Sequence, residues 1–251
     1  MQDRQMAILN IVSNTPKINV SNLAEQFGVS QVTIRRDLET LEKNGMLKRF
    51  HGGAMPVSDD DTARRLLTKF ETKLAIAKEA AALVENGETV IIECGSTNAL
   101  LAVELANKSG VTIITNSAFI CHYIRGLSGA RAILLGGDYQ KESEVMVGPL
   151  TRICLKQFHA KKAFIGVDGF RPDNGFTCVN MMRAEVAQAM ADQADQVIIL
   201  TDSGKFDQIG VASQIKAGDV DIVITDSGIG REKRQMLEKY GIEVITVQAG
   251  S

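Results

Sequence analysis

The chain has 251 residues, of which 45% are hydrophobic and 23% charged, and its formal net charge at pH 7 is −2. This composition is typical of a soluble globular protein with one or two domains, and it excludes a polybasic or disordered chain. No apolar run approaches the roughly 20 residues that span a bilayer, and the N-terminus lacks a signal peptide's apolar stretch, so we expect a cytoplasmic protein with no membrane partner.

The N-terminal region predicts three short helices followed by a hairpin. Residues 3–14 carry an apolar stripe, and a second helix lies between Asn19, which can cap it, and Gly28, which can end it. Ser30 can cap the third helix in the same way. The run "MLKRFHGGAM", residues 46–55, then reads as a short strand that turns at two adjacent glycines.

The third helix divides into an apolar and a polar face. At about 100° per residue, Leu38 and Leu41 fall within about 40° of Ile34, whereas Arg35 and Arg36 fall on the opposite arc. Arginine, glutamine and valine at the exposed end suit guanine, adenine and the thymine methyl, and a basic hairpin can act as a wing against phosphates or the minor groove. The alternative is a solvated helix whose charges only keep it soluble. The predicted DNA contacts are Ser30, Gln31, Val32, Thr33, Arg35, Arg36, Lys48, Arg49 and His51.

The run "VSNLAEQFGVSQVTIRRDLETLEKNGMLKRFHGGA", residues 20–54, resembles the N-terminal signature of the DeoR family of bacterial transcriptional regulators. The S-x-x-T-I-R-R-D-L core of that signature spans residues 30–38. The resemblance implies a winged helix-turn-helix domain and a double-stranded operator DNA as its partner. Asp37 lies beside the two arginines of the core, and we expect it to orient one of them.

After the acidic stretch "PVSDDD", residues 56–61, a helical pattern runs from 61 to 85 in one or two pieces. From Glu88 on, short apolar runs alternate with helical segments. Runs of this kind are buried on both faces, so the alternation predicts a mostly parallel α/β sheet. The runs are "TVIIE", "VTIIT", "RAILL", "KAFIGV", "QVIIL" and "DIVIT".

Small polar residues and glycines follow several of these predicted strands. Because the carboxyl ends of parallel strands open onto one crevice, they predict a shared ligand site, although each fragment alone is ordinary turn chemistry. Gly95, Ser96 and Thr97 also begin a helix, where free backbone N–H groups favour an anion such as phosphate. The four cysteines, Cys94, Cys121, Cys154 and Cys178, are widely spaced, and we expect reduced thiols, no metal site and no cofactor.

Residues 73–247 resemble the C-terminal effector domain of the same family, which is similar in fold to ribose-5-phosphate isomerase. The family's D-x-G-[ST]-T loop matches residues 93–97, and its G-x-D-G and D-S-x-K-F elements match 166–169 and 202–206. The resemblance implies a phosphorylated sugar as effector. The residues it assigns to effector binding are Gly95, Ser96, Thr97, Asn116, Ser117, Gly136, Gly137, Asp168, Gly169, Glu185 and Lys205, with Arg65 and Lys73 at basic positions near the domain junction.

By this resemblance Ser96 and Thr97 hold the phosphate, helped by Lys205, and the amide and carboxylates of the set bond to sugar hydroxyls. One position departs from the family. The chain has Glu93 where the family has aspartate, and we expect the extra methylene to push the carboxylate further into the crevice.

The sequence therefore predicts an α/β protein in three parts: a winged helix-turn-helix domain over 1–57, a connecting helical segment over 58–87 and an effector domain over 88–251. We expect a repressor of a carbohydrate-utilisation operon rather than an enzyme. We also expect a homodimer or homotetramer, because helix-turn-helix proteins read two-fold sites. The alternative is a sugar-phosphate isomerase-like enzyme with an accessory DNA-binding module. A nucleotide-binding Rossmann protein is the weaker third reading, since "CGSTNAL" lacks the G-x-G-x-x-G pattern.

Overall fold

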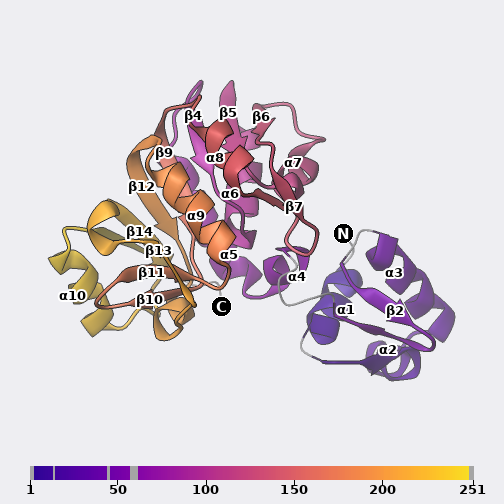
Figure 1. Ribbon diagram of the computed structural model, residues 1–251. Coiled ribbons are helices and arrows are strands. Elements are labelled where there is room, and N and C mark those ends of the chain that lie inside the picture. The colour runs from indigo at the N-terminus through magenta and orange to yellow at the C-terminus, as the bar shows by residue number, and fades with distance from the viewer. Residues whose placement is uncertain (1–2, 14, 44–45, 57–61, 249–251) are drawn as a thin grey trace. The chain divides into compact units, whose positions relative to one another are not determined.

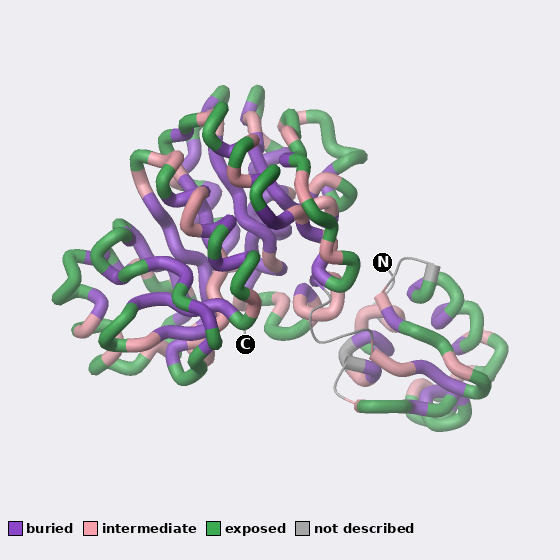
Figure 2. Tube along the Cα trace, in the orientation of Figure 1, coloured by how far each residue is buried: buried purple, intermediate pink, exposed green. Residues whose placement is uncertain are grey.

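The computed structural model describes residues 3–13, 15–43, 46–56 and 62–248. It divides into two compact units, residues 1–70 and 71–251 (Figure 1). Buried chain lies inside each unit and exposed chain around it (Figure 2). The predicted connecting segment, 58–87, is shared between the two units, and its residues 58–61 lie outside the described ranges.

The smaller unit consists of helices around a three-stranded antiparallel sheet, whose strand order is β1-β3-β2. β1 was not predicted, because two residues carry no readable period. α4, the last helix of this unit in the chain, contacts α1, the first. The elements in chain order are α1 (Asp3–Ser13), β1 (Ile18–Asn19), α2 (Val20–Phe27), α3 (Gln31–Lys43), β2 (Lys48–Phe50), β3 (Gly53–Met55) and α4 (Thr62–Leu67).

The ends of α2 and α3 follow the sequence signals. Gly28 ends α2 in the left-handed region, at φ 61°, where glycine has no steric penalty. The Ser30 hydroxyl accepts the backbone N–H of Thr33 at 3.2 Å and so caps α3. Asn19 occupies the N-cap of α2, but its side chain makes no capping hydrogen bond. The predicted start and end of α2 and the predicted start of α3 are therefore confirmed, and the predicted asparagine cap is wrong in its chemistry. The predicted end of the third helix at Gly45 lies outside the described residues.

The apolar face of α3 forms the centre of the smaller unit. Ile34, Leu38 and Leu41 are fully buried, in one cluster with Ile8 of α1 and Leu23 of α2. The inward face predicted from the helical wheel is confirmed. The packing of this buried face therefore fixes the position of the opposite, exposed face of α3.

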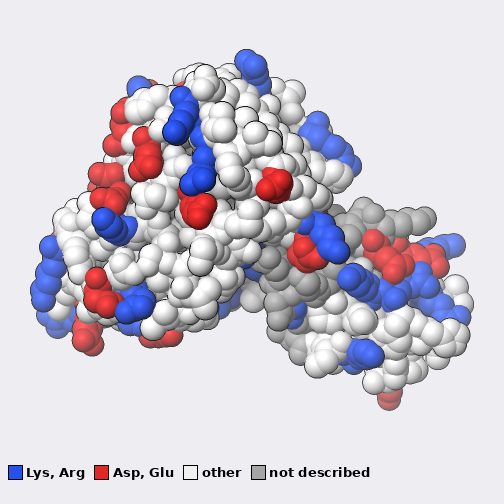
Figure 3. All heavy atoms as spheres, viewed as in Figure 1, with Lys and Arg blue, Asp and Glu red and all other residues white. Residues whose placement is uncertain are grey.

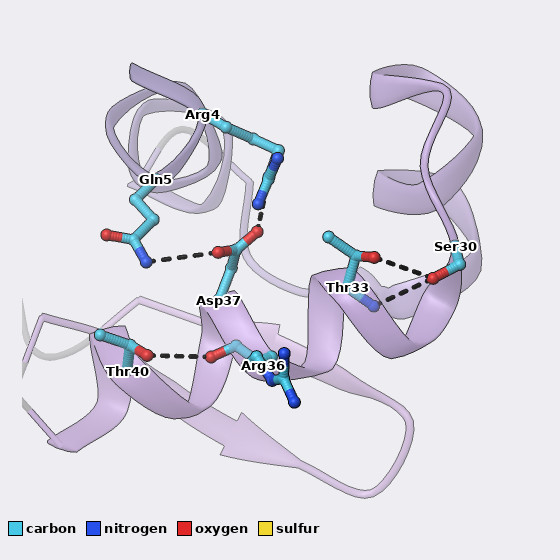
Figure 4. Close-up of polar contacts among 7 residues, drawn as sticks. All are labelled: Arg4, Gln5, Ser30, Thr33, Arg36, Asp37 and Thr40. Atoms are coloured by element: carbon cyan, nitrogen blue, oxygen red, sulfur yellow. Dashed lines mark hydrogen bonds and ion pairs between the residues drawn. The ribbon is translucent and has the colours of Figure 1, made fainter. Parts of the chain in front are cut away.

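Asp37 faces α1 and pairs with Arg4 there, not with Arg35 or Arg36. Its carboxylate accepts a hydrogen bond from Arg4 Nε at 2.7 Å and from Gln5 Nε2 at 3.3 Å, whereas the side chain of Arg36 points away from α1 (Figure 4). The expectation for Asp37 was wrong because a residue three places after Ile34 falls on the inward side of the helix. Asp37 therefore fastens α1 to α3.

Replacing Asp37 by alanine should destabilise the smaller unit, because the buried carboxylate that joins α1 to α3 is lost. We expect its thermal unfolding midpoint to fall by roughly 4–8 °C, the shift that 1 kcal/mol produces in a unit of this size. Thermal denaturation of the full chain, followed by circular dichroism, measures the midpoint at which the smaller unit unfolds. Glu25→Ala, at an exposed position of α2, is the matched control. Equal midpoints for the two variants would show that the contact contributes nothing.

The larger unit is built on a seven-stranded sheet with the order β15-β14-β12-β9-β4-β5-β6, in which every neighbouring pair is parallel. The predicted mostly parallel α/β sheet is confirmed. β4 and β9 lie side by side at the centre, and the chain runs outward from β4 on one side and from β9 on the other. The strands are β4 (Thr89–Ile92), β5 (Val111–Thr115), β6 (Ala130–Leu134), β9 (Ala160–Gly166), β12 (Ala194–Leu200), β14 (Ile222–Asp226) and β15 (Glu243–Val247).

Helices flank the sheet, and α8 and α9 lie in front of it in Figure 1. The connecting helical pattern is interrupted at Lys69, whose φ of 53° is left-handed, so that α5 begins anew after α4. None of the described helices is long and apolar enough to cross a bilayer. The helices of this unit are α5 (Phe70–Ala82), α6 (Ser96–Ala106), α7 (Ala118–Ile124), α8 (Pro149–Leu155), α9 (Met181–Ala191) and α10 (Arg231–Lys239), with short 3₁₀ helices η1 (Ser203–Asp207) and η2 (Ala217–Asp219).

Two small antiparallel sheets, whose strands are three or four residues long, were not predicted from the sequence. One pairs β7 (Asp138–Gln140) with β8 (Val145–Val147). The other has the order β10-β11-β13 and consists of β10 (Gly169–Arg171), β11 (Gly175–Cys178) and β13 (Ala212–Ile215). Both follow strands of the large sheet in the chain.

The expectation that every apolar run is buried on both faces was wrong for "RAILL". The first four residues of this run lie in β6, the last strand at one edge of the sheet, and Leu134 there is 42% exposed. An edge strand has a neighbour on one side only, so an apolar sequence does not guarantee burial.

Candidate functional site

The exposed end of α3 carries most of the predicted DNA contacts. Gln31, Arg35 and Arg36 are exposed, and Val32 beside them is 70% exposed. Thr33 is half-buried, and its hydroxyl lies 2.9 Å from that of Ser30. The structure thus presents amide, guanidinium and methyl groups together on one surface, as base-edge contacts require.

The hairpin of β2 and β3 places its basic residues beside α3. Lys48, Arg49 and His51 are all exposed, and basic and acidic side chains lie next to one another on the surface of the smaller unit (Figure 3). Arg49 also has internal partners: its Nη1 lies 3.2 Å from Glu39 Oε1, and its backbone N–H donates to Glu42 at 2.8 Å. Arg49 therefore joins the hairpin to α3, a role that the sequence did not reveal.

The centre of the larger unit is the point between β4 and β9 where the direction of strand succession reverses. Ligands of open α/β sheets bind outside the carboxyl ends of the strands at such a point. The loop after β4 brings Glu93–Thr97 there, and the loop after β9 brings Asp168. We call these residues, with Arg183 of α9, the switch-point site.

The helix that begins in this site has the geometry of an anion-binding N-terminus. Gly95 is the N-cap of α6 at φ 139°, a conformation that other residues rarely adopt, and no side chain caps the helix. Ser96 and Thr97 follow directly and are each less than one-tenth exposed. Backbone N–H groups and two hydroxyls therefore meet at the positive end of an 11-residue helix.

Glu93 is a buried carboxyl group of the switch-point site. Its Oε2 accepts the backbone N–H of Gly166 at 3.2 Å, and its Oε1 accepts the Cys94 thiol at 2.8 Å. Burial raises the pKa of Glu93 to about 7, partly offset by these hydrogen bonds and by the positive charge of Arg183. The longer side chain thus reaches across to β9, and its carboxyl group is held by the protein itself.

The switch-point site also contains two charged residues near Glu93, Arg183 and Asp168. The thiol of Cys178 lies near both. The Asp168 carboxylate accepts the backbone N–H of Val179 at 3.0 Å, and burial together with the Asp168 charge raises the pKa of Cys178 to about 12. Arg183 is 3% exposed and acts electrostatically on both Glu93 and Cys178. Sequence reasoning missed Arg183, although it lies in the first turn of α9, where a side chain can reach the carboxyl edge of the sheet.

Glu185 lies elsewhere. Two residues after Arg183 it points to another side of α9, where it is half-exposed and lies 3.6 Å from Arg152 of α8. It lines a groove to which none of the other predicted effector contacts contributes. The structure therefore does not bring Glu185 together with Ser96, Thr97 and Asp168.

Asn116 and Ser117, which follow β5, are almost fully buried. Asn116 donates from Nδ2 to the Met146 carbonyl at 3.0 Å, and its Oδ1 has no hydrogen-bond partner in the protein. The Ser117 hydroxyl caps α7 by accepting the N–H of Ile120. Asn116 thus retains an acceptor for a ligand hydroxyl, whereas Ser117 is occupied structurally.

The predicted glycines after β6 and β9 allow close approaches. A Cβ on Gly137 would lie 2.0 Å from Thr151 Oγ1, and one on Gly169 would lie 2.3 Å from the Gln208 carbonyl. Gly136 is exposed, and its carbonyl accepts the Thr151 hydroxyl. Lys205, in η1 after β12, is half-buried and donates to Gln208 Oε1 at 3.2 Å. Any larger residue at positions 137 and 169 would clash with these atoms, so the two glycines are explained by packing and need no ligand.

Among the predicted basic positions near the domain junction, Lys73 is buried and Arg65 half-buried. The four cysteines carry no disulfide in the structure. Within the described ranges, no three side chains of the kinds that bind metals lie together.

Comparison with protein families gives two matches that together cover most of the chain. Residues 4–62 match the DeoR-like helix-turn-helix domain, and residues 68–227 match the DeoR C terminal sensor domain. The second match alone spans more than half of the chain.

Relatives match along almost the whole length. The HTH-type transcriptional regulator GolR of Listeria innocua is 32% identical over 246 residues, which cover 96% of this chain and 97% of the relative. The transcriptional repressor AccR of Agrobacterium fabrum is 31% identical, with 90% of each chain covered. The HTH-type transcriptional regulator UlaR of Shigella dysenteriae is 28% identical, covering 97% of this chain and 98% of the relative.

Among solved structures, ribose 5-phosphate isomerase A of Methanocaldococcus jannaschii superposes with a TM-score of 0.40 at 20% identity, covering 53% of each chain. The eIF2B beta subunit of Chaetomium thermophilum gives 0.45 at 17% identity, covering 64% of this chain and 50% of its own. Likenesses this distant have no bearing on activity. The family matches and the full-length relatives do: the chain belongs to the DeoR family of transcriptional regulators, and it is a DNA-binding regulator, not an enzyme.

Proposed function

We propose that this regulator represses a carbohydrate-utilisation operon and that a phosphorylated sugar, bound at the switch-point site, controls its affinity for the operator. The observation that carries the proposal is the N-terminus of α6, where Gly95, Ser96 and Thr97 present backbone N–H groups and hydroxyls beside the β4–β9 junction. Repression is supported by the relative AccR, which is itself described as a transcriptional repressor.

On the DNA side, the proposal assigns α3 to the major groove of the operator. Gln31, Val32, Arg35 and Arg36 would contact base edges, while Lys48 and His51 of the hairpin would contact phosphates or the minor groove. A helix-turn-helix normally reads a two-fold site with two copies about 34 Å apart, so the active form is a dimer or a larger assembly of dimers. The place of action is the cytoplasm, where bacterial operators lie.

On the ligand side, the phosphate would lie against the first turn of α6. The helix dipole and the free N–H groups favour its negative charge, and the buried hydroxyls of Ser96 and Thr97 supply further donors. Asn116 Oδ1, which lacks a partner in the protein, and the Asp168 carboxylate would accept sugar hydroxyls. Lys205 lies on the loop after β12, two strands from β4, and would add a positive charge.

Control of DNA binding requires the ligand to have different affinities for two states of the protein. A coupling free energy of about 1–3 kcal/mol between the two sites changes operator affinity by roughly 5- to 150-fold. α4 of the smaller unit and α5 of the larger unit follow each other in the chain, and they are the segments through which such a change would pass.

A screen of phosphorylated sugars by thermal shift should identify the effector. A ligand at 100 times its dissociation constant stabilises the native state by about 2.7 kcal/mol. The double variant Ser96→Ala, Thr97→Ala should lose this shift, whereas the control Ser128→Ala, at an exposed position before β6, should keep it. A sugar phosphate that stabilises the double variant as much as the wild type would show that the ligand binds elsewhere.

A further inference from the structure

Two acidic residues lie on the surface of α3 that is proposed to contact DNA. Glu39 follows Arg35 and Arg36 by about one helical turn and so lies on the same exposed face, and Glu42 lies about one turn further on. Both acidic side chains are about half-exposed. Because carboxylates repel phosphates, acidic groups at this place lower the affinity for any DNA. Their contacts within the protein explain their presence.

Both carboxylates hold the hairpin of β2 and β3 through a single residue, Arg49. The backbone N–H of Arg49 donates to Glu42 Oε1 at 2.8 Å. Its guanidinium Nη1 lies 3.2 Å from Glu39 Oε1 and 3.9 Å from Glu42 Oε2. The backbone and the side chain of Arg49 are thus both bound to α3, and the positive charge of Arg49 offsets the negative charge of the two acids.

The hydrogen bond to Glu42 uses a backbone group at the edge of the sheet. β2 is the last strand in the order β1-β3-β2, so one row of its backbone groups points away from β3. Glu42 binds this edge from the side of α3. The same short hairpin carries the proposed DNA contacts Lys48 and His51. A shift of β2 relative to α3 would therefore move these groups relative to Arg35 and Arg36.

We propose that Glu42, assisted by Glu39, is a positioning residue for operator binding: its carboxylate holds the edge of β2 against α3, so that hairpin and helix present their basic groups in one fixed arrangement. The inference rests on the proposed DNA contacts of Lys48 and His51 and is independent of the ligand. Removing the carboxylate of Glu42 should then weaken operator binding, whereas the loss of a negative charge alone would strengthen it.

Two substitutions at position 42 remove the same charge but differ in the hydrogen bond. Glu42→Gln keeps an oxygen that can accept the Arg49 N–H, and Glu42→Ala keeps none. We expect Glu42→Ala to raise the operator dissociation constant at least about fivefold and to lower the salt slope by about 1, as the loss of one phosphate contact does. Glu42→Gln should bind at least as tightly as the wild type. Fluorescence anisotropy of the full chain, on an operator selected from a random DNA library and over a range of salt concentrations, measures both quantities. Equally tighter binding by the two variants would overturn the inference, because charge alone would then explain Glu42.

The hairpin is also held by the core of the smaller unit, in which Leu47 and Ala54 are buried, so we expect both variants to fold, as circular dichroism checks. Glu25→Ala removes an exposed carboxylate from α2 and should not weaken operator binding. Lys48→Ala tests the hairpin contact itself and should raise the operator dissociation constant. If Lys48→Ala weakens binding and Glu42→Ala does not, the positioning role is wrong and the proposed hairpin contact stands. If Lys48→Ala changes neither the affinity nor the salt slope, the hairpin contact is wrong and the positioning role fails with it.

Discussion

Arg36→Ala and Arg35→Ala are each expected to lower specific operator affinity by about 1–3 kcal/mol if the side chain reads a base edge, which raises the dissociation constant roughly 5- to 150-fold. Both side chains are exposed on the face of α3 opposite its buried residues. Because that opposite face is fully packed, the substitutions remove a contact to DNA without disturbing the fold. Fluorescence anisotropy on an operator selected from a random DNA library gives the dissociation constants.

The same titrations on a scrambled duplex separate base reading from phosphate contact. A base-reading arginine loses affinity for the operator alone, whereas a phosphate-contacting one loses it on both duplexes and lowers the salt slope by about 1. Arg131→Ala, at an exposed arginine of β6, is the matched control and should change neither. Unchanged operator affinity in both α3 variants would show that α3 is an ordinary solvated helix and does not contact the operator through these arginines.

Glu93→Gln is expected to remove a pH dependence of stability of about 3 kcal/mol from the larger unit. The pKa of Glu93 is raised from 4.5 to about 7, chiefly by burial. Between these values the folded chain keeps a proton that the unfolded chain has lost. The unfolding free energy of the wild type should therefore fall as pH rises through this window. Glutamine, which has no proton to lose, mimics the protonated acid.

Urea denaturation at pH 5 and pH 7.5 measures this effect as the difference between the two proteins, so that other titrating groups cancel. Glu232→Gln, at an exposed position of α10, changes a carboxylate without burial and should follow the wild type. If Glu93→Gln instead parallels the wild type between these two pH values, Glu93 is ionised throughout and the surroundings of β4 and β9 stabilise its charge.

The sequence predicted those parts of the fold that depend on local patterns. The apolar runs gave the central strands of the parallel sheet because each run alone carries the signal of burial on both faces. The wheel for α3 placed Ile34 and Leu38 inward because one helix has a fixed period. β6 departed from its pattern since burial there depends on which strand lies at the edge, and that is a property of the whole sheet.

The candidate site was less predictable because it joins segments far apart in the chain. Asp37 pairs with Arg4, 33 residues away, and Glu93 reaches Gly166, 73 residues away. Neither contact follows from the residues next to it. On α9 the sequence pointed to Glu185, but two residues of helix turn a side chain to another face, and Arg183 is the residue near Glu93. Which residue of α9 lies near Glu93 depends on how the helix is oriented in the fold, and the sequence of the helix alone does not give that orientation.

The most direct test of a ligand-controlled repressor is a titration of the operator complex with the sugar phosphate that stabilises the protein. We expect the ligand to change the operator dissociation constant of the wild type by roughly 5- to 150-fold. In the double variant Ser96→Ala, Thr97→Ala it should have no effect, although that variant binds the operator as tightly as the wild type. Operator binding that stays unchanged at saturating ligand in the wild type would show that the ligand does not control repression. Operator binding that is lost in the ligand-free double variant would show that Ser96 and Thr97 do not act through the ligand alone.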